Sequence, residues 1–191
     1  MDGPGAVIDR MAAGLDAQRA GRLAEAEAAY RGAFAQAPEQ PMAAYLLGLL
    51  TLSDGRIEEA ALLLRHALAL RPEHIDTRRA LAGACLAAGW RGEAIDLYRA
   101  VLARRPDDAV AGVNLARALQ EEGWPHEALA AAGEALRHGP ALAEAWHIAG
   151  VALRALGRLE AALEHLHRAV RLAPGHARAW MSLGHVAADL D

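Results

Sequence analysis

The sequence has little of several residue types, and each shortage excludes a class of protein. Lysine is absent, so all 20 basic residues are arginine, and they are mixed with 24 acidic residues. Without a basic block or stripe, a nucleic-acid-binding surface is not predicted. Cys85 is the only cysteine, which excludes an internal disulfide and a cysteine-based zinc cluster.

Long apolar runs are also missing. The longest, Met42–Leu52, is too short to cross a bilayer. The first residues lack the basic segment and apolar run of a secretory signal. We therefore expect a soluble, cytoplasmic protein with no membrane insertion. The arginine-for-lysine usage and the abundant alanine fit a GC-rich bacterial genome.

Aromatic residues make up only 4% of a chain that is 54% hydrophobic, so most of the apolar content is alanine and leucine. A wide central core normally needs larger side chains. Closely packed helices can use alanine instead, because small residues let helix axes approach one another. The composition therefore favours an all-α fold.

Three residue types recur with a step of 34 along the chain. The glycines are Gly21, Gly55, Gly89, Gly123 and Gly157; the prolines are Pro38, Pro72, Pro106, Pro140 and Pro174; the alanines are Ala26, Ala60, Ala94, Ala128 and Ala162. Between them, apolar residues fall at helical spacing. A fixed period of this length indicates a repeat architecture.

Each recurring residue has a mechanical role. The glycines stand where a first helix must stop, because glycine tolerates the left-handed conformation of such a stop. The prolines follow the second helix and block its continuation. The alanines are expected where two helices of a hairpin cross closely. Small residues also recur in the first helix of each unit: Gly14, Gly48, Ala82, Ala116, Gly150 and Gly184.

This pattern resembles the tetratricopeptide repeat. In the fifth unit it is carried by Trp146, Ala149-Gly150, Leu153, Gly157, Leu159, Ala162, Leu166, Ala169 and Pro174, and it runs from about Val7 to His176. The resemblance implies an all-α, right-handed superhelical solenoid of antiparallel helix hairpins with about 11 helices. We expect one domain over residues 1–191, with repeats 7–40, 41–74, 75–108, 109–142 and 143–176 and a terminal helix 177–191.

The resemblance also implies where a partner binds, because fixed places of each first helix face a concave groove. In the first two units these places are apolar: Met11, Leu15, Met42, Tyr45, Leu49 and Leu52. In the later units they are polar and basic: Arg79, Asn114, Arg117, Gln120, His147, Arg154, Arg178 and His185.

We therefore expect a two-part groove that takes a partner's hydrophobic helix or strand in one half and its acidic groups in the other. Arginine suits the second role because its planar fork meets a carboxylate bidentately. Two alternatives stay open. The arginines form ordinary ion pairs while the apolar half is filled by packing along the superhelix, or the apolar half is a self-association face.

Trp90 and Trp124 directly follow turn glycines, where other units have arginine. Each ring either leans back to replace the next packing residue, or the two form an edge interface that anchors a partner. In the fourth unit, Ala130-Ala131-Ala132-Gly133 replaces larger residues, which predicts that this unit is the least stable.

Nine histidines suggest metal binding, and His147 and His185 are expected to face the groove from adjacent units. However, no cysteine or evident carboxylate completes a ligand set, so no metal site is predicted. Cys85 occupies a packing position. No phosphate-binding loop, nucleophile elbow or histidine–carboxylate motif is present, so we expect neither a cofactor nor an enzyme.

Three functions remain. The leading one is a protein–protein interaction scaffold that binds a partner peptide or protein segment in its concave groove. The second is the N-terminal partner- or substrate-docking region of a larger bacterial enzyme, such as a glycosyltransferase or sulfotransferase. The third is a scaffold that self-assembles through its N-terminal groove.

Overall fold

The computed structural model describes residues 4–190, and every regular element in this range is an α-helix. The first helices of the repeats are α1 Pro4–Arg19, α3 Pro41–Ser53, α5 Ile75–Ala87, α7 Ala109–Glu121, α9 Ala143–Ala155 and α11 Ala177–Leu190. The second helices are α2 Leu23–Gln36, α4 Ile57–Leu70, α6 Arg91–Leu102, α8 Pro125–His138 and α10 Leu159–Leu172. The expected all-α fold of 11 helices is confirmed.

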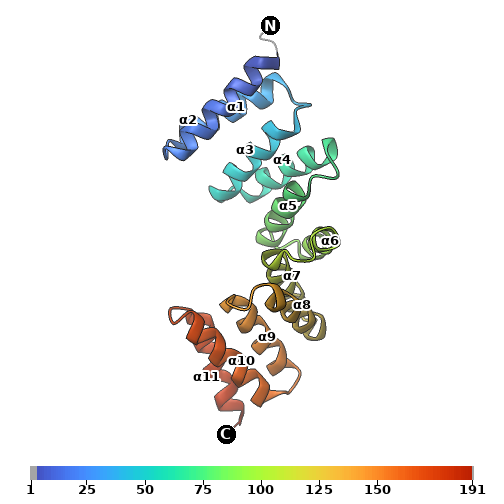
Figure 1. The fold of residues 1–191 in the computed structure, drawn as a ribbon, viewed down its shortest axis with the longest axis vertical. Coiled ribbons are helices and arrows are strands. Elements are labelled where there is room, and N and C mark those ends of the chain that lie inside the picture. The colour runs from blue at the N-terminus through green and yellow to red at the C-terminus, as the bar shows by residue number, and fades with distance from the viewer. Residues whose placement is uncertain (1–3, 191) are drawn as a thin grey trace. The chain divides into compact units, whose positions relative to one another are not determined.

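The chain divides into two compact units, residues 1–89 and 90–191. In the first unit, α1 pairs with α2 and α3 pairs with α4, while α5 packs against α4 (Figure 1). In the second unit, α7 pairs with α8 and α9 with α10, while α6 packs against α7 and α11 against α9 and α10. The single domain over 1–191 stays a prediction, and residues 1–3 and 191 lie outside the described part of the chain.

The first helices α1, α3, α5, α7 and α9 are each followed by a glycine with a positive φ between 73° and 79°, at Gly21, Gly55, Gly89, Gly123 and Gly157. At Gly55 the glycine N–H donates to Leu52 O and the N–H of Arg56 donates to Thr51 O, at 3.1 and 3.0 Å. These two bonds define a Schellman turn, which satisfies the last carbonyls of the helix. The predicted role of the glycines is therefore confirmed, and it fixes where every hairpin folds back.

The two helices of a hairpin approach closely wherever the recurring small residue is glycine. The pairs are Gly14 with Tyr30, Gly48 with Leu64 and Gly150 with Leu166. A Cβ at Gly150 would lie 2.6 Å from Leu166 Cγ and 3.2 Å from the backbone oxygen of Ala162. In these three repeats the glycine leaves room for the large residue on the second helix, whereas in the third repeat Ala82 and Tyr98 occupy the same two places and are both buried.

The fourth repeat uses a different pair at the same positions. Ala132 stands on α8 where other units have tyrosine or leucine, and Ala116 stands opposite in place of glycine; both are fully buried in one core cluster. The methyl group of Ala116 fills part of the space that the smaller residue leaves. Whether this repeat is the least stable stays a prediction.

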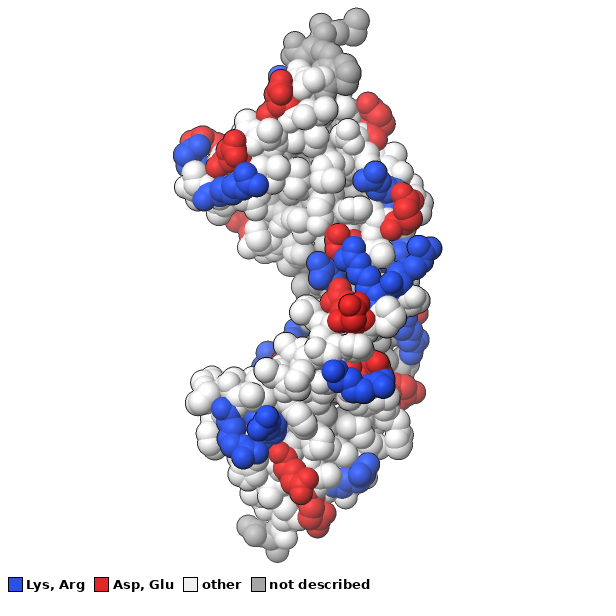
Figure 2. All heavy atoms as spheres, viewed as in Figure 1, with Lys and Arg blue, Asp and Glu red and all other residues white. Residues whose placement is uncertain are grey.

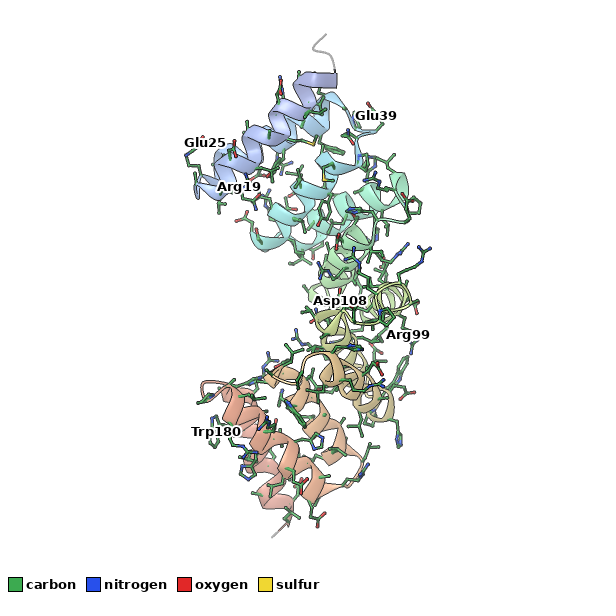
Figure 3. The ribbon with its side chains drawn as sticks, in the orientation of Figure 1. Arg19, Glu25, Glu39, Arg99, Asp108 and Trp180 are labelled. Carbon is green, nitrogen blue, oxygen red and sulfur yellow. The ribbon has the colours of Figure 1, made fainter. Side chains whose placement is uncertain are left out.

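Three first helices begin at a residue whose side chain caps the helix. His74, Asp108 and His176 each accept a hydrogen bond from a backbone N–H three residues later, at 3.3, 2.9 and 3.2 Å. All three occupy the same place in the 34-residue register, and Asp108 is labelled at the start of α7 in Figure 3. Side-chain oxygens or imidazole nitrogens at this place satisfy an otherwise unpaired donor.

Ion pairs join neighbouring second helices in the first unit. Arg56 Nη1 lies 2.7 Å from Glu27 Oε1, and Arg31 Nη2 lies 2.5 Å from Glu59 Oε1. The hydrogen bonds from Arg56 and then Arg31 lower the pKa of the Glu27 carboxyl. On the face shown in Figure 2, arginine and acidic side chains are interspersed on each unit, which is the mixed charge that the composition predicts.

Candidate functional site: a groove over α7, α9 and α11

The first helices α7, α9 and α11 of the second unit together line a cavity of about 340 Å³. We call this cavity the C-terminal groove. Six residues that the repeat pattern assigns to a binding face lie in its lining: Arg117, Gln120, His147, Arg154, Arg178 and His185. They come together because successive first helices pack side by side and present the same positions of the repeat.

A neighbouring cavity of similar volume, about 340 Å³, lies along α7 and the start of α9. Asn114, also assigned to the binding face, lines it together with Val110 and Val113. Arg117 and Glu144 line both cavities, so the two spaces adjoin. The C-terminal groove therefore continues into a more apolar space.

Two of the three arginines in the groove hold carboxylates. Arg117 Nη2 lies 3.2 Å from Glu144 Oε1, and Arg154 Nε lies 2.6 Å from Asp189 Oδ2. The hydrogen bond with Arg154 lowers the pKa of the Asp189 carboxyl. Arg178 is exposed, and no carboxylate within residues 4–190 pairs with it. The ion-pair alternative thus holds for Arg117 and Arg154, while Arg178 presents its whole charge to the groove.

Glu144 is the centre of a polar cluster at the floor of the groove. Its Oε2 lies 2.6 Å from His176 Nε2 and 3.8 Å from His147 Nδ1. The two imidazole rings are 4.9 Å apart between centroids. His147 is 6% exposed, and its Nε2 lies 3.1 Å from Ser182 Oγ. The cluster therefore joins α9 to the start and the middle of α11.

The electrostatics of this cluster favour an ionised Glu144. The imidazole of His147, then that of His176 and the guanidinium of Arg117, lower the pKa of the Glu144 carboxyl to about 2, although burial alone would raise it. The carboxylate is thus a permanent negative charge at neutral pH, surrounded by cationic or hydrogen-bonding groups.

His176 is the residue of this cluster that the sequence did not reveal. His147 and His185 both line the groove, but the ring beside His147 is that of His176. His176 caps α11, which turns its ring back toward α9. The missing carboxylate is supplied by Glu144, in the first turn of α9. The available sign for His176 was its register place, which it shares with the polar residues His74 and Asp108 that cap α5 and α7.

The apolar residues assigned to the binding face in the first two repeats are for the most part packed against the core or half-buried. Met11 is 8% exposed and packs in a core cluster with Val7, Ala33 and Ala43, and its place in a groove stays a prediction. Leu15 and Met42 pack against core clusters as well.

Tyr45 stacks edge-on against His74, with centroids 5.4 Å apart, and the space beside them holds about 10 Å³. This is no more than the room for one water. Leu49 and Leu52 are half-buried on α3. Arg79, on α5, lies 3.5 Å from Asp76 on the same helix.

Trp90 and Trp124 begin α6 and α8, and they keep 37% and 43% of their surface exposed. Neither ring is fully shielded, so the edge interface stays a prediction. Trp180, labelled on α11 in Figure 3, is 51% exposed and donates from Nε1 to Pro174 O at 2.9 Å. Cys85 is fully buried, as its packing position predicts.

The sequence matches the family described as tetratricopeptide repeat over residues 11–75, 52–109 and 143–186. These matches cover more than half of the chain, which therefore belongs to the tetratricopeptide repeat family. Within residues 4–190 no helix has the length and apolar character to cross a membrane. The cytoplasmic location and the bacterial source stay predictions.

Solved structures of other tetratricopeptide proteins share the fold. YrrB, titled a TPR protein with an unusual peptide-binding site, is 23% identical with a TM-score of 0.82, over 92% of this chain and 91% of that one. The MamA protein is 19% identical with a TM-score of 0.81, over 91% and 94%. MamA 41-end from Desulfovibrio magneticus RS-1 is 19% identical with a TM-score of 0.82, over 90% and 97%. No curated protein sequence matches the chain.

Proposed function

We propose that this chain is a protein-interaction scaffold that binds a segment of a partner protein in the C-terminal groove. The observation that carries the proposal is the cavity of about 340 Å³ lined by three successive first helices. A cavity of this size, open along a row of helices, suits an extended or helical peptide. YrrB, whose title gives it a peptide-binding site, has the same fold.

The chemistry of the groove favours an acidic segment. Its lining carries three arginines against two glutamates, Glu121 and Glu144. Glu121 and Glu144 are themselves bound by Arg91 and Arg117, at 3.1 and 3.2 Å. A guanidinium has five N–H donors, so an arginine that holds one carboxylate can still bind a second. Arg178 is the strongest candidate for the first contact with the partner's carboxylates.

A peptide array that samples acidic and neutral sequences tests this function. The unmodified protein is expected to bind a subset of acidic peptides, and Arg178→Glu to bind them at least about tenfold more weakly, because a charge-assisted hydrogen bond contributes about 1.5–3 kcal/mol. Arg171→Glu is the matched control, since Arg171 is an exposed arginine on the second helix α10.

Reversal of Arg178 is more informative than reversal of Arg117 or Arg154, because those two changes would also break the ion pairs with Glu144 and Asp189. If Arg178→Glu and Arg171→Glu bind the acidic peptides equally well, the C-terminal groove is not the binding site and the proposal is wrong. The docking region of a larger enzyme and the self-assembling scaffold stay predictions.

A further inference from the structure

The Glu144–His147–His176 cluster is more elaborate than a peptide groove requires. One carboxylate and two imidazoles, from α9 and the start of α11, place their ligand atoms within 4.8 Å of one another. We propose that these three residues bind one divalent transition-metal ion of the zinc type. The site stands independently of peptide binding, because it needs only the floor of the groove.

The distances fit a zinc ion after small rotations of the side chains. Zinc binds nitrogen and oxygen at about 2.0–2.2 Å, so two ligands of a tetrahedral site lie roughly 3.3 Å apart. Glu144 Oε2 lies 2.6 Å from His176 Nε2 and 3.8 Å from His147 Nδ1, one value below and one above that separation. Two imidazoles and one carboxylate are ligands that zinc, nickel, copper and cobalt accept, and magnesium and calcium do not favour.

Two of the three ligands already have the outer partners that metal ligands use. Glu144 Oε1 is held by Arg117, which leaves Oε2 for the ion. His147 Nε2 is hydrogen-bonded to Ser182 Oγ, which leaves Nδ1 for the ion. Such outer contacts orient a ligand and fix its tautomer.

His147 supplies the second, independent observation. Its side chain is more than nine-tenths buried, and Nδ1 has no hydrogen-bond partner within the described residues. An unpaired nitrogen at such a position costs free energy, because it has lost water without gaining a partner. A cation between this nitrogen and Glu144 would remove the deficit.

His176 has to change its protonation to bind an ion. Its Nδ1 accepts the Ala179 N–H at 3.2 Å, so its Nε2 carries the proton that points to Glu144. When a metal ion takes the place of that proton at Nε2, the proton of the neutral ring moves to Nδ1. The hydrogen bond that caps α11 is then lost, so metal binding should expose the Ala179 amide to exchange.

The ion would keep an open position. Glu144 and His147 both line the C-terminal groove, so the fourth ligand is a water molecule or a side chain of a bound partner. With three protein ligands and one exchangeable ligand, the site should have an intermediate affinity for the metal ion. This affinity should fall at acid pH, because protons compete with the ion for the imidazole nitrogens.

Zinc competition against a chromophoric indicator, with tag-free protein at pH 7.5, tests the proposal. One ion per chain is expected. Glu144→Gln, His147→Ala and His176→Ala should each weaken binding at least about tenfold, and Ser182→Ala should weaken it less. His165→Ala and His167→Ala, on α10, are matched controls that should bind as the unmodified protein does. Cobalt should give the visible absorption of a tetrahedral site.

Two measurements keep the outcome decisive. Far-UV circular dichroism shows whether each variant is folded, and only folded variants are compared. In the unmodified protein, zinc should accelerate hydrogen exchange at the Ala179 amide at least several-fold. The proposal is overturned if zinc does not bind, or if the control variants lose binding as much as the cluster variants.

Discussion

Substitution of Gly150 by alanine tests whether the recurring glycines are required by close helix packing. A Cβ at this position would lie 2.6 Å from Leu166 Cγ and 2.9 Å from Leu166 Cδ2. Leu166 is fully buried in a core cluster, so it has little room to move away. Gly184 stands at the equivalent place on α11, where a Cβ would meet no atom within 4 Å. The two positions therefore differ in packing and share their place in the repeat.

The magnitudes follow from two opposing effects. Alanine favours a helix over glycine by about 1 kcal/mol, so Gly184→Ala should stabilise the protein by up to that amount. Gly150→Ala gains the same helix preference but adds an overpacking cost of about 1–3 kcal/mol. We expect Gly150→Ala to destabilise the protein by about 0–2 kcal/mol, and the difference between the two variants to be about 1–3 kcal/mol.

Urea unfolding followed by circular dichroism measures both variants against the unmodified protein. Leu166→Ala provides a second background in which the obstructing side chain is gone, and there Gly150→Ala should become stabilising. Equal stabilisation by Gly150→Ala and Gly184→Ala would refute the reasoning, because it would show that Leu166 does not limit the position.

Three further predictions concern the fourth repeat, the Glu144 carboxylate and the partly exposed tryptophans. Ala132→Leu should destabilise the protein by about 1–3 kcal/mol, because the larger side chain overpacks the core cluster. In the double variant, Ala116→Gly should restore most of the lost stability. If the two substitutions instead lower the free energy of unfolding in urea additively, the prediction is contradicted. Folding lowers the pKa of the Glu144 carboxyl from 4.5 to about 2. In EDTA and above pH 5, the unmodified protein should therefore be about 1–3 kcal/mol more stable than Glu144→Gln, and this difference should vanish as the pH falls to 2. A stability difference that stays constant with pH would contradict this prediction. Variants that keep only Trp90 or only Trp124 should show red-shifted emission that iodide quenches, since more than a third of each side chain is exposed; blue-shifted, unquenched emission from both would end the edge-interface hypothesis.

The fold was predictable because its requirements are local and recur. A left-handed turn at Gly55 or Gly157 requires glycine in every repeat, and proline after the second helix blocks the same continuation each time. Part of the lining of the C-terminal groove followed from the same regularity, since Arg117 and His185 share one place of the 34-residue register and Gln120 and Arg154 share another.

The departures have a different physical origin. Met11 packs in a core cluster on α1, and Val113 and His147, at the same place of the 34-residue register, are buried as well. His176 escaped prediction because a capping residue precedes its helix, and helical periodicity does not fix the direction of its ring. Glu144 became significant only through these neighbours, which lie three and 32 residues away in the sequence.

The five glycine turns constrain the number of residues in each repeat more strongly than they constrain which residues fill it. One residue inserted within α9, between His147 and Arg154, would rotate everything after it by about 100° around the helix axis and move Arg154 out of the groove. Substitutions carry no such penalty, provided that each pair across a hairpin keeps its combined size. This asymmetry explains how structures only 19–23% identical can still align over more than nine-tenths of the chain. In this fold, the amino-acid identities can vary widely, whereas the number of residues is expected to change by whole repeats.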